Sequence, residues 1–118
     1  MDFQHNERAD ALRRRIDDFM DTQVFPVEHL NREQVHASGD PATRYRTPPV
    51  LQQLKAKARA QGLWNLFLPG DHGAGLSNLD YAPLAESMGR VLWASEVFNC
   101  SAPDTGNMEV LAQYGTPE

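Results

Sequence analysis

The chain has 118 residues, a formal net charge of −5 at pH 7 and 41% hydrophobic residues, which are the size and composition of one globular domain with one core. The acidic balance argues against a nucleic acid or an anionic membrane as a partner, since both bind basic surfaces. The single cysteine excludes an internal disulfide, no apolar run approaches the roughly 20 residues of a membrane span, and the N-terminus is too polar for a secretory signal, so a cytoplasmic protein is predicted.

The first predicted helix covers about residues 7 to 23. One apolar face recurs at helical spacing and is formed by Leu12, Ile16, Phe19 and Met20. Pro26 has no backbone N–H, so the helix is expected to end or kink just before it. A further turn could follow, and residues 31 to 46 are expected to form a loop.

A second helix is predicted from Thr47, as its cap, to just before Gly62, with two prolines in the first turn. Its buried face contains Leu51, Leu54 and Ala58. Residues 63–69 form the most apolar run, which we expect to be an extended, buried connector. A glycine-dense turn follows in G-D-H-G-A-G-L-S, which lacks the spacing of a phosphate-binding loop.

A third helix is expected to open at Ser77, because Ser77 and Asp80 have the spacing of a capping box. Pro83 conflicts with this, since proline in a helix interior costs about 3 kcal/mol, so either the first turn is irregular or the helix starts later. The helix is expected to end or bend at Gly89. Its predicted core face contains Tyr81, Leu84, Ala85, Met88 and Leu92.

Two shorter helices are predicted at about 94–100 and 104–114. No segment reads convincingly as a strand, so the predicted fold class is all-α: an up-and-down-like domain of about five helices with an extended apolar connector near 63–69. The last residues, Thr116-Pro117-Glu118, are a helix-start signal with no helix behind it. We therefore expect the chain to be the N-terminal part of a longer protein.

The residues alone indicate no catalytic apparatus. Cys100 and Ser101 lack a neighbouring base and a nucleophile elbow, and a lone cysteine is usually a small buried hydrophobe. The small residues around Cys100, directly before the last helix, leave two interpretations open: a close helix–helix turn, or one wall of a pocket for an elongated apolar ligand. No metal-ligand spacing relates Cys100 to the histidines, which are His5, His29, His36 and His72.

Four motifs follow the first helix in a fixed order: G-L-W-N-L-F-L-P, G-A-G-L-S-N-L-D-Y, L-A-E-S-M-G-R and V-F-N-C-S-A-P-D-T-G-N-M-E-V-L-A-Q-Y-G-T-P-E. This ordered set resembles the acyl-CoA dehydrogenase family, from about Leu12 onward and most strongly from Gly62. The last motif is most similar to the branch with the tenth and eleventh human family members and their bacterial relatives. The chain departs from the family pattern at Asp71-His72 and at Pro83.

The resemblance implies that residues 1–118 are the N-terminal helical domain of a longer enzyme that also has a middle β-domain and a C-terminal helical domain. That enzyme would use FAD, held mainly by the other domains, to oxidise the Cα–Cβ bond of an acyl-CoA to the 2-enoyl-CoA. The catalytic base would lie outside this chain, so none of Glu86, Glu96 and Glu109 is assigned that role. The implied partners are the acyl-CoA substrate, an electron-transfer flavoprotein or similar acceptor, and further copies in a homo-oligomer.

The resemblance also implies which residues line the acyl chain: Val97, Ser101, Ala102 and Thr105. The hydroxyls of Ser101 and Thr105 could bind a substituted acyl chain. The alternative is a self-contained, non-enzymatic helical binding or interaction module. The two hypotheses differ in one property, since a domain that packs against others should leave a large apolar surface bare.

Overall fold

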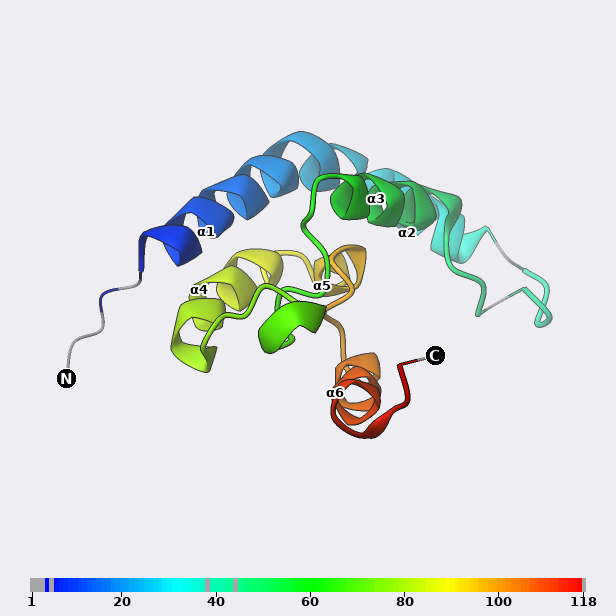
Figure 1. Cartoon of the computed structure of the whole chain (residues 1–118). Coiled ribbons are helices and arrows are strands. Elements are labelled where there is room, and N and C mark those ends of the chain that lie inside the picture. Colours follow the sequence, from blue (N-terminus) through cyan, green and yellow to red (C-terminus); the bar gives the residue numbers. More distant parts are fainter. Residues whose placement is uncertain (1–3, 5, 38, 44, 118) are drawn as a thin grey trace.

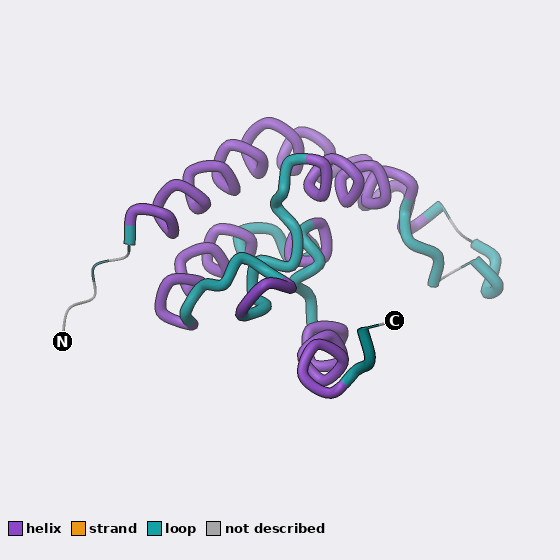
Figure 2. The backbone as a smooth tube through the Cα atoms, viewed as in Figure 1, coloured by secondary structure: helices purple, strands orange, loops and turns teal. Residues whose placement is uncertain are grey.

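The computed structural model describes residues 4, 6–37, 39–43 and 45–117, and the regular structure of these residues is entirely helical (Figure 2). The predicted all-α fold class is therefore confirmed. The α-helices are α1 (Glu7–Phe19), α2 (Glu28–His36), α3 (Pro49–Ala60), α4 (Asn78–Met88), α5 (Ala94–Val97) and α6 (Asp104–Tyr114). A π-helical turn (Met20–Val24) and two 3-10 turns (Phe25–Val27 and Gly70–His72) complete the regular elements.

Helix α1 begins at Asn6, whose side-chain Oδ1 accepts a hydrogen bond from the Ala9 backbone N–H at 2.7 Å. This satisfies one of the donors that a helix N-terminus leaves free. The apolar face that the sequence predicts is buried as expected, with Ile16 and Met20 fully inaccessible.

Pro26 does not end the helical path. The π-helical turn shifts the hydrogen-bond register just before Pro26, and the 3-10 turn holds this proline at its start, where a missing N–H costs little. The chain then continues as α2 to His36, so the predicted loop is wrong over residues 31–36. Turns and bends occupy the rest of that stretch, apart from Ser38 and Arg44, which lie outside the described residues.

Helix α2 also supplies the cap of α3. The N-cap position of α3 is Pro48, and neither it nor Thr47 caps the helix with a side-chain hydrogen bond. Instead the Gln34 side chain accepts from the Val50 backbone N–H at 2.9 Å. The predicted Thr47 cap is therefore wrong, because a residue from the neighbouring helix takes its place.

The connector after α3 is buried, as predicted, but it is not extended, because residues 64–68 form bends and turns. Leu63, Leu66 and Leu68 are at most 4% exposed, and the backbone follows turns with Asn65 at a φ of 55°. The following glycine turn packs closely on this connector. A Cβ atom at Gly73 would lie 2.2 Å from the Leu68 carbonyl oxygen, so this position has no room for a side chain.

Helix α4 starts where the capping box predicts, with the Asp80 backbone N–H donating to Ser77 Oγ at 3.1 Å. Its path continues through Pro83, so the expected irregular or later start is wrong. Burial of the proline ring offsets part of the cost of the lost hydrogen bond. The core face is also smaller than predicted: Ala85 is exposed, and Leu92, in the turn after the helix has ended at Gly89, is 99% exposed.

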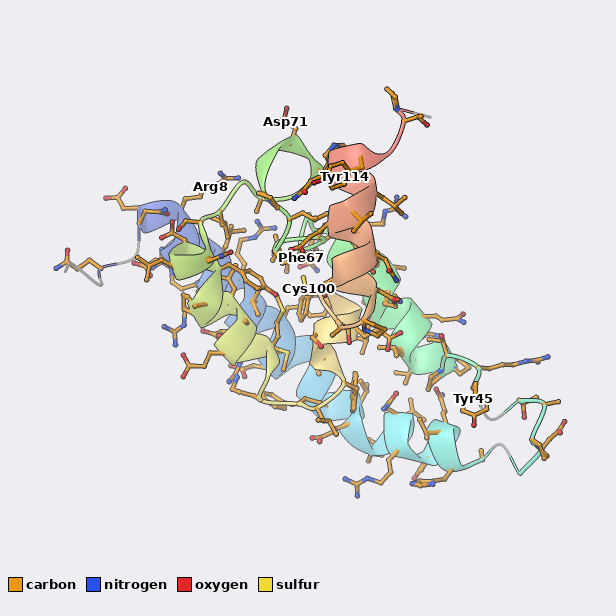
Figure 3. The ribbon with its side chains drawn as sticks, turned by 90° about the horizontal axis from the view of Figure 1, so that it is seen from below. Arg8, Tyr45, Phe67, Asp71, Cys100 and Tyr114 are labelled. Atoms are coloured by element: carbon orange, nitrogen blue, oxygen red, sulfur yellow. The ribbon has the colours of Figure 1, made fainter. Side chains whose placement is uncertain are left out.

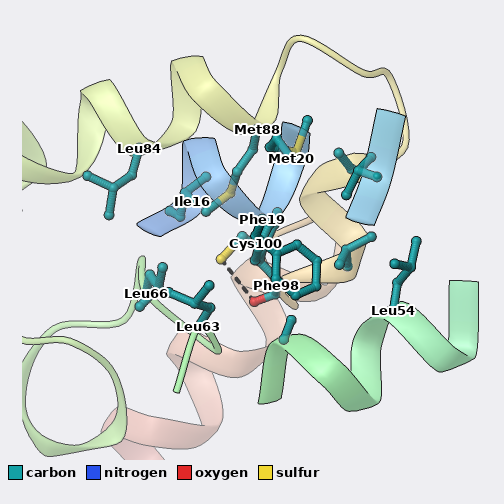
Figure 4. Packing of buried hydrophobic residues seen from close by; sticks show 14 of the residues in the cluster. Ile16, Phe19, Met20, Leu54, Leu63, Leu66, Leu84, Met88, Phe98 and Cys100 are labelled. Carbon is teal, nitrogen blue, oxygen red and sulfur yellow. Dashed lines mark hydrogen bonds between the residues drawn. The ribbon is translucent and has the colours of Figure 1, made fainter. Parts of the chain in front are cut away.

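One apolar core joins α1, α3, the connector, α4 and α5 (Figure 4). At its centre the rings of Phe19 and Phe98 meet edge to face with centroids 5.4 Å apart. Helix α6 lies outside this core, below the other helices in Figure 1, and contains no buried residue. The Cα radius of gyration is 15.5 Å, compared with about 13.5 Å for a compact domain of this length, in keeping with a projecting helix. No helix within the described ranges is long and apolar enough to cross a membrane.

Candidate functional site

The four residues that the sequence places along an acyl chain lie on the segment from α5 to the start of α6. Val97 is fully buried in the core at the end of α5. Ser101 and Thr105 are half-buried, and Ala102 is exposed. The structure therefore presents Ser101, Ala102 and Thr105 at the surface, whereas Val97 lies in the core.

Two asparagines that the sequence analysis does not single out organise this segment. Asn99 Nδ2 donates to Asn65 Oδ1 at 2.6 Å and to the Met108 sulfur at 3.2 Å. Both asparagines have φ at 55°, a left-handed conformation that asparagine tolerates better than most residues. The tendency of asparagine to adopt this conformation is the only signal in the sequence that could have pointed to them.

Cys100, which directly follows Asn99, is not an activated nucleophile. Its thiol is buried and donates to the Phe98 carbonyl oxygen at 3.3 Å (Figure 4). Burial raises the pKa of the Cys100 thiol, against smaller opposite effects of the Phe67 backbone N–H and the Tyr81 hydroxyl. Burial also raises the pKa of Tyr81 above its usual value of 10.0, and Cys100 adds to this effect. Both groups are therefore neutral at physiological pH.

The carboxylates of the chain form no catalytic or metal cluster in the described part. Glu96 pairs with Lys55 of α3 at 3.4 Å, and Asp17 of α1 pairs with Arg90 at 3.1 Å. No group of three or more His, Cys, Asp or Glu side chains among the described residues could hold a metal ion. His5 lies outside the described residues.

An open hollow of about 270 Å³ lies between α6 and the connector. Another, of about 370 Å³, lies beside the N-terminal half of α1. Sites that enclose drug-sized ligands have volumes of about 300–1,000 Å³. FAD carries two ring systems joined by a pyrophosphate, and neither open hollow would enclose it. The residues that line these two hollows therefore do not by themselves fit this cofactor. The hollow beside α6 is lined by Asn65, Leu68, His72, Met108, Leu111 and Ala112.

Helix α6 exposes three large apolar side chains, alongside the exposed polar residues Asn107 and Gln113. Val110 is 58%, Leu111 69% and Tyr114 81% exposed. Seen from below, α6 lies in front of the other helices, with Tyr114 near its C-terminal end (Figure 3). Large apolar side chains exposed on one short helix make α6 a candidate interaction surface.

Comparison with known proteins matches residues 6–118 to the model "Acyl-CoA dehydrogenase, N-terminal domain". Acyl-CoA dehydrogenase family member 10 of Mus musculus is 53% identical over 107 residues, which cover 85% of this chain and 10% of that protein. "Probable acyl-CoA dehydrogenase FadE2" of Mycobacterium tuberculosis is 45% identical over 122 residues, which cover 100% of this chain and 28% of that protein.

The fold has a counterpart among solved structures. A candidate acyl-CoA dehydrogenase from Mycobacterium abscessus superposes with a TM-score of 0.81 and 52% sequence identity, covering 97% of this chain and 30% of that one. The chain thus spans less than a third of the length of these relatives. The match over residues 6–118 shows that the chain belongs to the acyl-CoA dehydrogenase family and corresponds to the family's N-terminal domain.

Proposed function

We propose that this chain is the N-terminal helical domain of an FAD-dependent acyl-CoA dehydrogenase, and that it forms one wall of the acyl-chain pocket. The full enzyme would oxidise the Cα–Cβ bond of an acyl-CoA to the 2-enoyl-CoA. The observation that supports this most directly is the group of large apolar side chains that α6 exposes, directly after a segment of small residues. A self-contained helical module would be expected to cover more of these side chains.

In this proposal Ser101, Ala102 and Thr105 contact the acyl chain, and Val97 supports them from the core. Ala102 leaves room for the chain because its side chain is a single methyl group. Ser101 and Thr105 are half-buried residues, and their hydroxyls could hydrogen-bond a substituent on the chain.

The chemistry itself would belong to the domains outside this chain. FAD supplies the oxidising flavin when it is bound, and a glutamate of another domain removes the α-proton of the substrate. The glutamates of this chain are poorly placed for that role, since Glu86 and Glu109 are exposed and Glu96 is paired with Lys55. The domain alone would therefore be inactive. We further propose a homo-oligomeric, cytoplasmic enzyme that passes electrons to an electron-transfer flavoprotein or a similar acceptor.

The test is to express the full gene product, measure bound flavin by absorbance, and assay a panel of acyl-CoAs with an artificial electron acceptor. We expect a yellow protein that reduces the acceptor only when an acyl-CoA is present. A full-length protein that is colourless and inactive even with added FAD would contradict the proposal. That result would favour the alternative, a non-enzymatic helical binding or interaction module.

A further inference from the structure

We infer that Asn99, held by Asn65, is a positioning residue that fixes the segment carrying Ser101, Ala102 and Thr105, and so sets which acyl chains the enzyme accepts. This inference rests on the proposed function, because it concerns the same pocket wall. Asn99 would not touch the substrate. It would act through the residues that follow it.

The first argument is the way Asn99 closes the segment. Its Nδ2 donates to the sulfur of Met108, nine residues further along the chain, at 3.2 Å. This contact brings the start of the segment against the first half of α6. It closes off residues 100–107, a short turn followed by the first residues of α6, and this stretch contains the three residues proposed to contact the acyl chain.

The second argument is the anchor on the other side. The same Nδ2 donates to Asn65 Oδ1 at 2.6 Å, and the Asn65 backbone N–H donates to the Phe98 carbonyl oxygen at 3.1 Å. Asn65 belongs to the buried connector, where the glycine turn also packs: a Cβ at Gly73 would lie 2.5 Å from the Asn65 carbonyl oxygen. The start of the segment is therefore attached to a closely packed part of the molecule.

The third argument is how little else holds α6. No residue of this helix is buried, and the half-buried face that it turns toward the body contains only Thr105, Met108 and Ala112. A helix so lightly packed depends on a few specific contacts for its position. Asn99 provides one of them, from its Nδ2 to Met108, and the same nitrogen anchors this contact to Asn65 of the connector. Its loss should therefore change the position of the pocket wall more than the stability of the core.

The test uses the full-length gene product and the substitution Asn99→Gly. Glycine keeps the left-handed backbone without strain and removes the whole side chain, which is one methylene group and the amide that makes both hydrogen bonds. We expect the KM for acyl-CoAs long enough to reach this wall to rise about fivefold, the factor that corresponds to one net hydrogen bond. The KM for the shortest accepted acyl-CoA and the kcat for all substrates should not change.

Two further variants show whether the amide acts as the structure indicates. Asn65→Asp keeps an oxygen that accepts from Asn99 Nδ2, so its chain-length profile should match the wild type. Met108→Leu keeps the apolar volume but removes the sulfur acceptor, so it should shift the same KM values by a smaller factor. Asn107→Ala is the matched control, because Asn107 is an exposed asparagine on α6, next to Met108.

The outcomes separate this inference from the function on which it rests. A wild-type enzyme that oxidises no acyl-CoA would contradict the proposed function. If the wild type is active and both Asn99→Gly and Met108→Leu keep its KM values for every chain length, the positioning role would be overturned. If Asn99→Gly does not fold, the Met108→Leu profile alone decides. A shift of all KM values by one factor would also overturn the role, because it would indicate a general loss of structure.

Discussion

Two glycines should respond in opposite ways to an added methyl group. At Gly73 a Cβ would clash with the carbonyl oxygens of Leu68 and Asn65, at 2.2 and 2.5 Å, whereas at Gly106 in α6 it would meet nothing within 4 Å. We expect Gly73→Ala to lower the free energy of unfolding by about 1–3 kcal/mol, the usual cost of overpacking. Gly106→Ala should raise it by about 0.5–1 kcal/mol, because alanine is the better helix former. Urea unfolding of both variants checks this, and two changes of the same sign would contradict it.

The buried thiol and phenol predict how stability depends on pH. Both have a pKa raised in the folded state, so their stabilising contribution is complete below their unfolded pKa values and is lost as the pH rises. The free energy of unfolding should therefore fall above about pH 9, near the usual pKa of cysteine. In Tyr81→Phe and Cys100→Ala this alkaline fall should be smaller, which urea unfolding between pH 7 and 10.5 would measure. An unchanged slope in both variants would show that other groups cause it.

The candidate site could be predicted only in part at this scale. The small residues at 101 and 102 are visible in the sequence, and so is the lone Cys100, which is a buried hydrophobe as expected. The pairing of Asn65 with Asn99 is not visible, because it joins two turns 34 residues apart and depends on how those turns meet. The roles of Ser101, Ala102 and Thr105 remain predictions from the family.

At the scale of elements, the helices with a regular apolar stripe were the predictable ones. The α1 stripe and the Ser77 capping box both hold in the structure. The sequence does not predict α2, because this helix is polar, with Asn31 as its one buried residue, and because Pro26 is a strong local stop signal. Helix α2 packs on α3 and caps it, and a local sequence pattern does not reveal such a tertiary contact.

The contact between α2 and α3 gives a prediction. Gln34→Ala should lower the free energy of unfolding by about 1 kcal/mol, since the Val50 N–H loses its acceptor in a partly buried place. Gln34→Glu should retain most of the stability because it keeps an acceptor oxygen. Gln53→Ala, at an exposed position of α3, is the matched control, with an expected change within about 0.5 kcal/mol. A loss in Thr47→Ala as large as in Gln34→Ala would instead support the local cap expected from the sequence.

At the scale of the whole molecule, the sequence predicts the fold class and the family well, because both depend on the order of motifs along the whole chain. It also predicts that apolar surface should be bare. It does not predict which residues form this exposed surface. A helix with an apolar face has the same sequence pattern whether its partner lies in the same chain or in another domain. The exposed residues of α6 could be identified only in three dimensions.

We expect the isolated chain to bind a dye that fluoresces on apolar surfaces, chiefly at α6. Leu111→Gln should reduce this fluorescence and leave the urea midpoint unchanged, because Leu111 is 69% exposed and contributes little to the core. Val35→Gln, at a residue 49% exposed on α2, is the control and should change the fluorescence much less. The prediction fails if Leu111→Gln binds the dye as strongly as the wild type does.

The light attachment of α6 has a consequence for how sequence variants of this protein are interpreted. A screen that scores substitutions by expression or melting of this domain would classify positions 110, 111 and 114 as tolerant, since those side chains contribute little to the core. If the family's other domains cover this helix, selection for function of the full-length protein would remove substitutions at the same positions. A mismatch between the two kinds of score, concentrated on α6, would then outline the buried contact area residue by residue.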